Sequence, residues 1–179
     1  MRPRLLYAWP LLLATLLAGC QTVSDPPPTV VDDLDLQRFM GDWYVVANIP
    51  TFIEEGAHNA LESYRLDDKG RVQTTFRFRQ GGFDGDEKVY RPTGYVSDDN
   101  NAVWGMQFLW PFKAEFLVLY VDDDYRHTVI GRSARDYVWL MAREPAVSGP
   151  AYSGGLRASL RSGTIASKVG GFSISVVKS

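Results

Sequence analysis

The stretch GDWYVVANIP (Gly41–Pro50) decides the fold. It opens with a glycine suited to a tight entry, continues with two large aromatic residues, and then alternates small apolar side chains. This pattern predicts the first strand of a β-domain, over residues 41–49, with Trp43 anchoring one end. Because side chains alternate along a strand, Val45 and Ala47 are expected on the same inward face as Trp43.

Turn signals recur after this stretch at intervals of about 8 to 12 residues, a spacing typical of antiparallel sandwiches and barrels. A short helical plug is expected over 35–40, just before the first strand. Eight strands joined by hairpins favour an all-β, up-and-down antiparallel barrel. The strands are expected at 41–49, 59–67, 71–80, 88–97, 101–109, 114–121, 126–132 and 136–143.

The first nineteen residues read as a targeting segment. Arg2 and Arg4 precede an apolar run, Leu11–Leu17, that is too short to span a bilayer as a helix. The run ends in Leu-Ala-Gly-Cys at 17–20, which resembles the bacterial lipobox. That resemblance implies cleavage of residues 1–19 before Cys20, diacylation of the Cys20 thiol and acylation of the new amino terminus. Two or more acyl chains anchor a protein stably to a membrane, where one chain is marginal.

The remaining chain divides into three parts. Residues 20–33 contain Pro26-Pro27-Pro28 and predict a stiff, extended tether. Residues 34–146 carry the strand pattern and form the expected barrel, followed by a C-terminal part at 147–179. In lipoproteins of this type, a residue other than Asp after the acylated cysteine indicates the outer membrane; here it is Gln21. We expect a lipid-anchored protein on the periplasmic face of the outer membrane.

Composition excludes several classes of partner and site. The whole chain has a formal charge of −2 and its first nineteen residues carry +2, so residues 20–179 carry −4. No basic stripe is present, which argues against nucleic acid. A single cysteine excludes an internal disulfide and a cysteine-based metal cage. No metal site and no cofactor are expected.

Alternate turns of an up-and-down barrel lie on opposite rims, and sorting the turns in this way separates them by chemistry. One rim collects tight, acid-rich turns at 67–70, 97–101 and 122–124. The other collects longer turns, three with apolar tips and one with two arginines, at 51–56, 81–86, 110–112 and 132–135. The pattern indicates a container with a closed polar base and an open apolar mouth.

Period-two alternation selects the inward side chains. Those expected to line the interior are Phe76, Phe78, Trp104, Met106, Phe108 and Trp139. An eight-stranded barrel is just wide enough for either a packed core or a cavity, so both interpretations remain open at this point. Arg132 and Arg135 are candidates to bind a ligand carboxylate or phosphate at the mouth, with solvated loop arginines as the alternative. The strand at 114–121 is apolar on both faces, which leaves its orientation open.

Three motifs resemble those of the lipocalin family. They are Gly41-Asp42-Trp43-Tyr44 at the first strand, 123–130 around Asp124 and Tyr125, and Met141–Pro145, which contains Arg143. Their order and spacing fit eight strands, and the similarity is to the bacterial branch related to apolipoprotein D. The resemblance covers roughly residues 34–146. It implies that Arg143 lies across the Trp43 indole at the closed base, a structural contact worth about 0.5–2 kcal/mol.

The C-terminal part departs from the family pattern. Lipocalins follow the eighth strand with an amphipathic helix and a short extra strand. Tyr152, Leu156 and Leu160 keep a helical stripe, but Gly154-Gly155 interrupts it at a cost of about 1 kcal/mol per glycine. A weakened helix is expected, with residues 172–177 as the final strand.

The function expected from these features is non-enzymatic binding of a lipid-like ligand, a fatty acid or lysophospholipid, for storage, transport or repair in the cell envelope. One alternative is an enzyme on a lipocalin scaffold. His58 and His127 are the only histidines, and no nucleophile motif accompanies them. Another is a filled-core adaptor that binds proteins through its open-end loops. The apolar tip at Trp110–Phe112 suits a bilayer contact, a homodimer contact or folding into the mouth.

Overall fold

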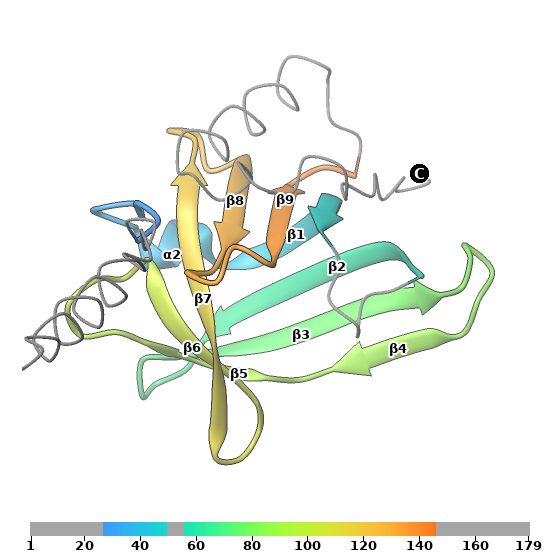
Figure 1. Cartoon of the computed structure of the whole chain (residues 1–179), viewed down its shortest axis with the longest axis horizontal. Helices are drawn as coiled ribbons and strands as arrows, with labels where there is room; N and C mark the ends of the chain where they lie inside the picture. The colour runs from blue at the N-terminus through green and yellow to red at the C-terminus, as the bar shows by residue number, and fades with distance from the viewer. Residues whose placement is uncertain (1–26, 50–55, 146–179) are drawn as a thin grey trace, which may run out of the picture.

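The structure is a computed structural model that describes residues 27–49 and 56–145. A short helix, α2 (Leu36–Phe39), precedes nine strands (Figure 1). The strands are β1 (Gly41–Ile49), β2 (Ala57–Leu66), β3 (Arg71–Gln80), β4 (Glu87–Tyr90), β5 (Thr93–Val96), β6 (Val103–Leu109), β7 (Phe112–Val121), β8 (His127–Gly131) and β9 (Val138–Ala142). No helix among these residues is long and apolar enough to cross a bilayer.

The strands form one antiparallel sheet that closes on itself. Its order is β2-β1-β9-β8-β7-β6-β5-β3-β4, and an additional β2–β3 pairing closes eight of the strands into a barrel, with β4 outside the ring. The predicted eight-stranded up-and-down barrel is therefore confirmed, with one extra strand. All pairings are antiparallel. All of them join strands consecutive in the chain, except β3–β5 and β1–β9, the pairing of the first and last described strands.

The extra strand arises because the segment predicted as a single strand at 88–97 is split in two. Arg91 and Pro92 separate β4 from β5, and proline has no backbone N–H to donate to a ladder. Residues 76–79 of β3 pair with β4, whereas residues 71–73 pair with β5. Only β5 continues the barrel to β6; in the described part of the chain, β4 pairs with β3 alone.

A β-bulge in β1 changes which side chains face inward. The register of the β1–β9 pairing shifts between Val45 and Ala47. Val45 packs with Trp43 in the interior cluster, but Ala47 joins a second cluster on the outer face. The expectation that Ala47 faces inward is therefore wrong, because an extra residue in one strand reverses the alternation beyond it.

The orientation of β7, which the sequence left open, is resolved. Phe116 and Val118 pack in the interior with Trp43, whereas Leu117 and Leu119 pack in the outer cluster. That outer cluster is buried and lies on β1, β7, β8 and β9; its members are Val46, Ala47, Leu117, Leu119, Val129, Val138, Leu140 and Ala142. The predicted C-terminal helix and final strand lie outside the described residues.

Candidate functional site

The base of the barrel is closed by α2 and the turns beside it. The Asn101 side chain donates a hydrogen bond to the Leu34 carbonyl (3.2 Å), and the Arg38 guanidinium donates to the Asp123 carbonyl (2.7 Å). Asp35 caps α2 by accepting from the backbone N–H of Gln37 and of Arg38. The plug and the polar turns predicted for one rim therefore meet at one end.

Arg143, which directly follows β9, joins several parts of this base. Its guanidinium lies 3.9 Å from the ring of Trp43 and donates to the carbonyls of Asp42 (2.9 Å), Arg38 (2.7 Å) and Tyr125 (3.2 Å). Burial lowers the pKa of Arg143, opposed by the nearby Asp42 carboxylate. One side chain thus joins the plug, β1 and the turn before β8.

Gly41 is needed beside this guanidinium for two reasons. Its φ of +96° lies in the left-handed region that glycine adopts without strain, and a Cβ there would lie 3.2 Å from Arg143 Nη1. Gly41, the first residue of β1, therefore leaves the space that the Arg143 guanidinium occupies.

Asp122 organises the turn before β8. Its carboxylate accepts from the backbone N–H of Arg126 (2.6 Å) and of His127 (3.0 Å) and lies 2.7 Å from His127 Nδ1. Burial would raise the pKa of Asp122, but these hydrogen bonds outweigh it and the pKa is lowered. Asp124, named from the motif as a structural residue, is exposed, while Tyr125 accepts from the Asp35 N–H at 2.8 Å.

A cluster of aromatic rings fills the interior just above the plug. We call it the base cluster, and its members are Phe39, Trp43, Tyr64, Trp104 and Phe116. The rings of Trp104 and Phe116 stack at 4.9 Å, and the Trp104 indole donates to the Asn101 carbonyl at 2.6 Å. Trp104 was expected among the cavity-lining residues, but the structure places it in the packed base.

A second cluster lies further along the interior, where β3 and β9 approach the opposite rim. We call it the mouth cluster, and its members are Phe76, Phe78, Tyr90, Tyr137 and Trp139. The Phe76 and Trp139 rings lie 5.1 Å apart although they come from β3 and β9. Three of these residues were predicted as lining. Tyr90 was not predicted, because the break in the strand at Pro92 makes the inward or outward direction of the preceding side chains impossible to assign by alternation.

The remaining predicted lining residues lie apart from the mouth cluster. Met106 is buried against Gly94, whose Cβ position would be 3.0 Å from the Met106 sulfur. Phe108 is 48% exposed. The reason is a register shift in the β6–β7 pairing between Met106 and Leu109, which ends the regular alternation before Phe108 is reached.

Two buried polar side chains, which the sequence reasoning missed, lie beside the aromatic clusters. Glu62 is buried opposite Trp43 and Phe76 in the ladders, and the Tyr64 hydroxyl donates to its carboxylate. Thr74, the ladder partner of Tyr64, is also buried. Its hydroxyl finds no hydrogen-bond partner within the described part of the chain. An acidic residue at an inward strand position runs against the expected alternation, so the pattern gave no signal for it.

This isolated hydroxyl yields a stability prediction. Thr74→Val should raise the free energy of unfolding by about 1 kcal/mol, because it removes a buried donor that gains no bond in the folded state. Thr128→Val is the matched control, since the buried Thr128 hydroxyl donates to the Tyr120 carbonyl at 2.7 Å. That variant should lose about 1 kcal/mol in urea denaturation. Equal losses in both variants would show that Thr74 has a partner.

The two candidate arginines lie in the turn between β8 and β9. Arg132 binds the Asp136 carboxylate through Nε (2.5 Å) and Nη2 (2.6 Å), which raises the pKa of Arg132. Arg135 is half-buried with a positive φ of 53°. Ser133 ties the turn to β7 by donating to Glu115 from its backbone N–H and its hydroxyl. Arg132 is therefore an ion-paired side chain rather than a freely solvated one.

The histidines and acidic turns show no assembled reaction centre. His127 pairs with Ala142, a member of the outer cluster, so its side chain lies on the outward face near the base. His58 packs against Phe83 at 5.0 Å on the β2–β3 side. Within residues 27–49 and 56–145, no three His, Cys, Asp or Glu side chains are placed to share a metal ion. Cys20, the predicted acylation site, lies outside those residues.

Known proteins are similar to this sequence over most of its length. The profile of the family described as "Lipocalin-like domain" matches residues 34–169. The chain is 28% identical over 140 residues to "Outer membrane lipoprotein Blc" of Citrobacter freundii, which covers 75% of this chain and 77% of the relative. It is 26% identical over 130 residues to "Apolipoprotein D" of Bos taurus, which covers 67% and 66%.

Solved structures show the same fold at lower sequence identity. Insecticyanin from the tobacco hornworm Manduca sexta aligns with a TM-score of 0.68 at 15% identity, over 86% of both chains. Lobster apocrustacyanin A1 aligns with a TM-score of 0.62 at 13% identity, over 86% of this chain and 91% of that one. Together with the closed barrel, these matches confirm the resemblance that the sequence motifs indicated: this chain belongs to the lipocalin family, and its relatives include the bacterial outer membrane lipoproteins.

Proposed function

We propose that the protein binds a lipid-like ligand, a fatty acid or lysophospholipid, at the open end of its barrel. The observation that carries the proposal is the mouth cluster. Phe76, Phe78 and Trp139 are buried inside the closed barrel above a separately packed base, and the more exposed Tyr90 and Tyr137 continue the cluster to the rim. Apolar interiors with a few polar groups are the usual sites for small hydrophobic ligands. Burial of an acyl chain there would contribute about 0.8 kcal/mol per CH₂.

The polar side chains suggest how such a ligand is oriented. Glu62 is a buried carboxylic side chain at the inner boundary of the mouth cluster. A charged headgroup placed at this depth would lose its hydration in an apolar interior. The polar headgroup of a fatty acid or lysophospholipid is therefore expected to point outward, and the methyl end of the acyl chain toward the base. Arg132 and Arg135 lie at the rim that the headgroup would reach.

A binding role fits the placement of the titratable residues better than catalysis. The histidine of the Asp122–His127 pair lies on the outward face near the base, on the other side of the β8–β9 wall from the inward rings. A general acid or base must lie within hydrogen-bond reach of the reacting group. A ligand held by the mouth cluster would be out of reach of His127, and loss of any measured activity in His127→Ala would contradict this.

The proposed setting is the outer membrane, with Cys20 acylated and the residues between Cys20 and Val31, where the chain meets β7, acting as the tether. The support is the lipobox-like sequence together with the printed name of the bacterial relatives. Acylation is checked by incorporation of a labelled fatty acid that is lost in Cys20→Ala.

Tryptophan emission tests the ligand directly. Titration of the purified full chain with palmitate or lysophosphatidylcholine should quench emission, because Trp139 lies in the mouth cluster and contacts Phe76. The quenching should saturate at one ligand per barrel and should be reduced in Trp139→Phe. Unchanged emission with both lipids, in a protein that also retains no lipid by native mass spectrometry, would contradict the proposal.

A further inference from the structure

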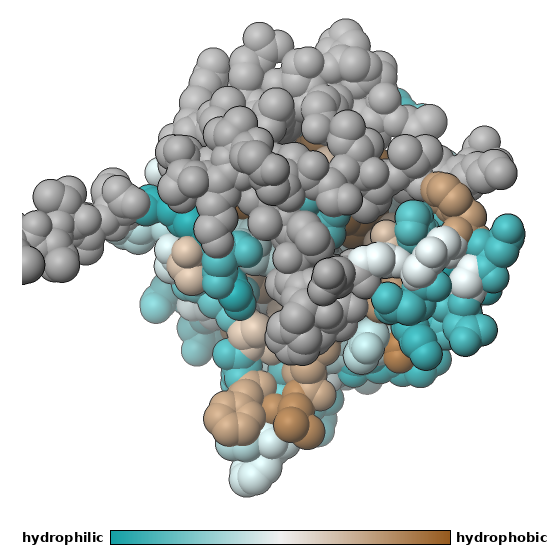
Figure 2. Space-filling model, turned by 45° about the vertical axis from the view of Figure 1, so that its right-hand side comes forward, coloured by the Kyte–Doolittle hydropathy of each residue, from teal (hydrophilic) through white to brown (hydrophobic). Residues whose placement is uncertain are grey.

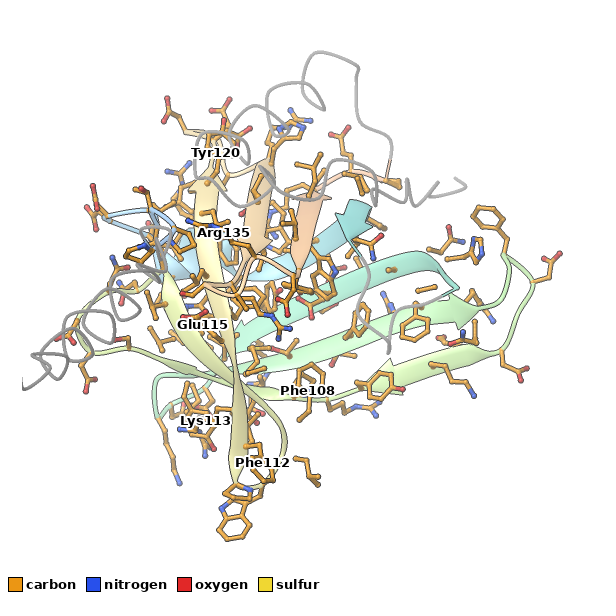
Figure 3. All side chains as sticks on the ribbon, in the orientation of Figure 1. Phe108, Phe112, Lys113, Glu115, Tyr120 and Arg135 are labelled. Carbon is orange, nitrogen blue, oxygen red and sulfur yellow. The ribbon has the colours of Figure 1, made fainter. Side chains whose placement is uncertain are left out.

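The hairpin between β6 and β7 carries large apolar side chains that no part of the barrel covers. Leu109 is 71% exposed, Trp110 80% and Phe112 73%. We call these three residues and Phe108 the hairpin tip. The hairpin projects from the lower edge of the barrel, with Phe112 pointing away from it (Figure 3), and apolar side chains mark its end in Figure 2. Exposed apolar groups gathered in this way usually mark a binding surface.

The local structure holds these side chains outward. Leu109 pairs directly with Phe112, so the chain turns through Trp110 and Pro111 alone. The register shift that precedes Leu109 separates the end of the hairpin from the regular barrel wall. On the other side of β6, the pairing with β5 ends at Thr93 and Gln107, so no described strand pairs with Phe108 and Leu109 from that side. The tip is therefore a narrow apolar point at the open end.

The size and chemistry of the tip favour a lipid surface over a protein partner. Four such side chains expose roughly 600 Å², given that a large aromatic residue offers about 150–250 Å². A stable protein interface buries about 800 Å² on each partner. Tryptophan and other aromatic residues are favoured at the headgroup level of bilayers, where an apolar ring meets polar surroundings.

Charge near the tip is also suited to phospholipid headgroups. Residues 108–114 contain no acidic side chain, and the first charge after the tip is Lys113. The Lys113 ammonium lies 3.8 Å from the centre of the Tyr95 ring, which holds it on the barrel wall behind the hairpin tip. A cation at this position can bind a lipid phosphate while the aromatic rings enter the interface.

The expected tether is long enough for this contact. The Val31 N–H donates to the Val118 carbonyl at 3.0 Å, so the N-terminal segment meets β7 there. Six residues of β7 separate Val118 from Phe112, about 20 Å of strand. The eleven residues from Cys20 to Val31 span at most about 36–40 Å when extended. A chain anchored at Cys20 can therefore bring the hairpin tip to the same membrane surface.

We propose that the hairpin tip inserts into the headgroup region of a phospholipid membrane, with the open end of the barrel facing the bilayer. This inference rests on the anchored setting proposed above. The orientation places the mouth cluster next to the lipid phase, from which an acyl ligand would enter or leave the barrel. Anchoring and docking are separate contacts, made by Cys20 and by the hairpin tip respectively.

Quenching by brominated lipids tests the docking. The acylated full chain is reconstituted with vesicles of phosphatidylethanolamine and phosphatidylglycerol that carry brominated acyl chains. Trp43, Trp104 and Trp139 are at most 3% exposed, whereas Trp110 is 80% exposed. Comparison with Trp110→Phe isolates the Trp110 signal and cancels any quenching by a bromolipid bound inside the barrel. The fraction of emission quenched should be larger in the parent than in Trp110→Phe, because aromatic side chains at the headgroup level lie close to the acyl chains.

A second reporter tests the orientation. Lys69 is exposed in the turn between β2 and β3 at the base, so Lys69→Trp in the Trp110→Phe background places an indole at the opposite end. This reporter should show no added quenching. Equal quenching in parent and Trp110→Phe, or stronger quenching of an indole at position 69, overturns the docking proposal. Flotation of the protein with the vesicles in a density gradient is measured in parallel, and protein that floats still supports the Cys20 anchor. Failure to float overturns both. A Trp110 emission shift that depends on protein concentration without vesicles assigns the tip to a second copy and also overturns the proposal.

Discussion

Replacement of Arg143 by alanine should lower the free energy of unfolding by about 3 kcal/mol, because charged hydrogen bonds and a cation–π contact are lost together. The guanidinium donates to carbonyls of Arg38, Asp42 and Tyr125 and covers Trp43. Urea denaturation followed by far-UV circular dichroism measures the loss. Arg143→Lys should recover little of it, since one ammonium cannot reproduce the planar fork.

Arg126→Ala is the matched control for this result. Arg126 also forms an ion pair near the base, with Glu144, but both side chains are more than half exposed. Exposed pairs contribute at most about 1 kcal/mol, so this variant should unfold close to the parent. Ligand affinity should change little in Arg143→Ala, because the arginine lies at the end opposite the mouth cluster. An unfolding midpoint equal to that of the parent would refute the structural role of Arg143.

Trp139→Ala should weaken lipid binding about 30-fold, the equivalent of about 2 kcal/mol, through loss of apolar contact in the mouth cluster. Trp139 is buried inside the barrel and packs on Phe76 and Tyr137. Titration calorimetry with lysophosphatidylcholine gives the affinity, and a parallel urea denaturation gives the stability.

The neighbouring residue separates affinity from stability. Leu140 lies on the same strand but in the outer cluster, and it is as buried as Trp139. Leu140→Ala should lower the free energy of unfolding by about 2–5 kcal/mol and leave the affinity of the folded protein unchanged. If Trp139→Ala lowers the free energy of unfolding but leaves the lipid affinity unchanged, the interior is a packed core and the ligand site lies elsewhere.

Strand positions and the closed end could be predicted from the sequence, since both follow from local pattern. The β1 and β3 bounds match the predicted 41–49 and 71–80, and α2 lies within the predicted plug. The Arg143–Trp43 contact was implied by the family resemblance, and the structure shows it at 3.9 Å. The errors appear where one residue disturbs the ladder, as at the bulge before Ala47 and at Pro92.

The depth of a side chain inside the barrel could not be predicted in this way. Alternation tells which face a residue occupies, but not its level along the barrel axis. Trp104 and Trp139 both face inward, yet one packs in the base cluster and the other in the mouth cluster. Pairings between segments distant in the chain, such as Ser133 with Glu115, depend on how a turn meets a neighbouring strand. Glu62 is buried although polar side chains are expected to face outward, so only the structure reveals its position.

Native mass spectrometry of the purified acylated chain tests the central claim most directly, because it detects a bound lipid without assuming its identity. Collisional activation separates a non-covalently held lipid from the acyl groups on Cys20. We expect one acyl lipid per barrel in the parent and in Arg143→Ala, and a largely empty barrel in Trp139→Ala. A parent protein that carries no lipid as purified, and retains none after incubation with palmitate or lysophosphatidylcholine, would contradict the account.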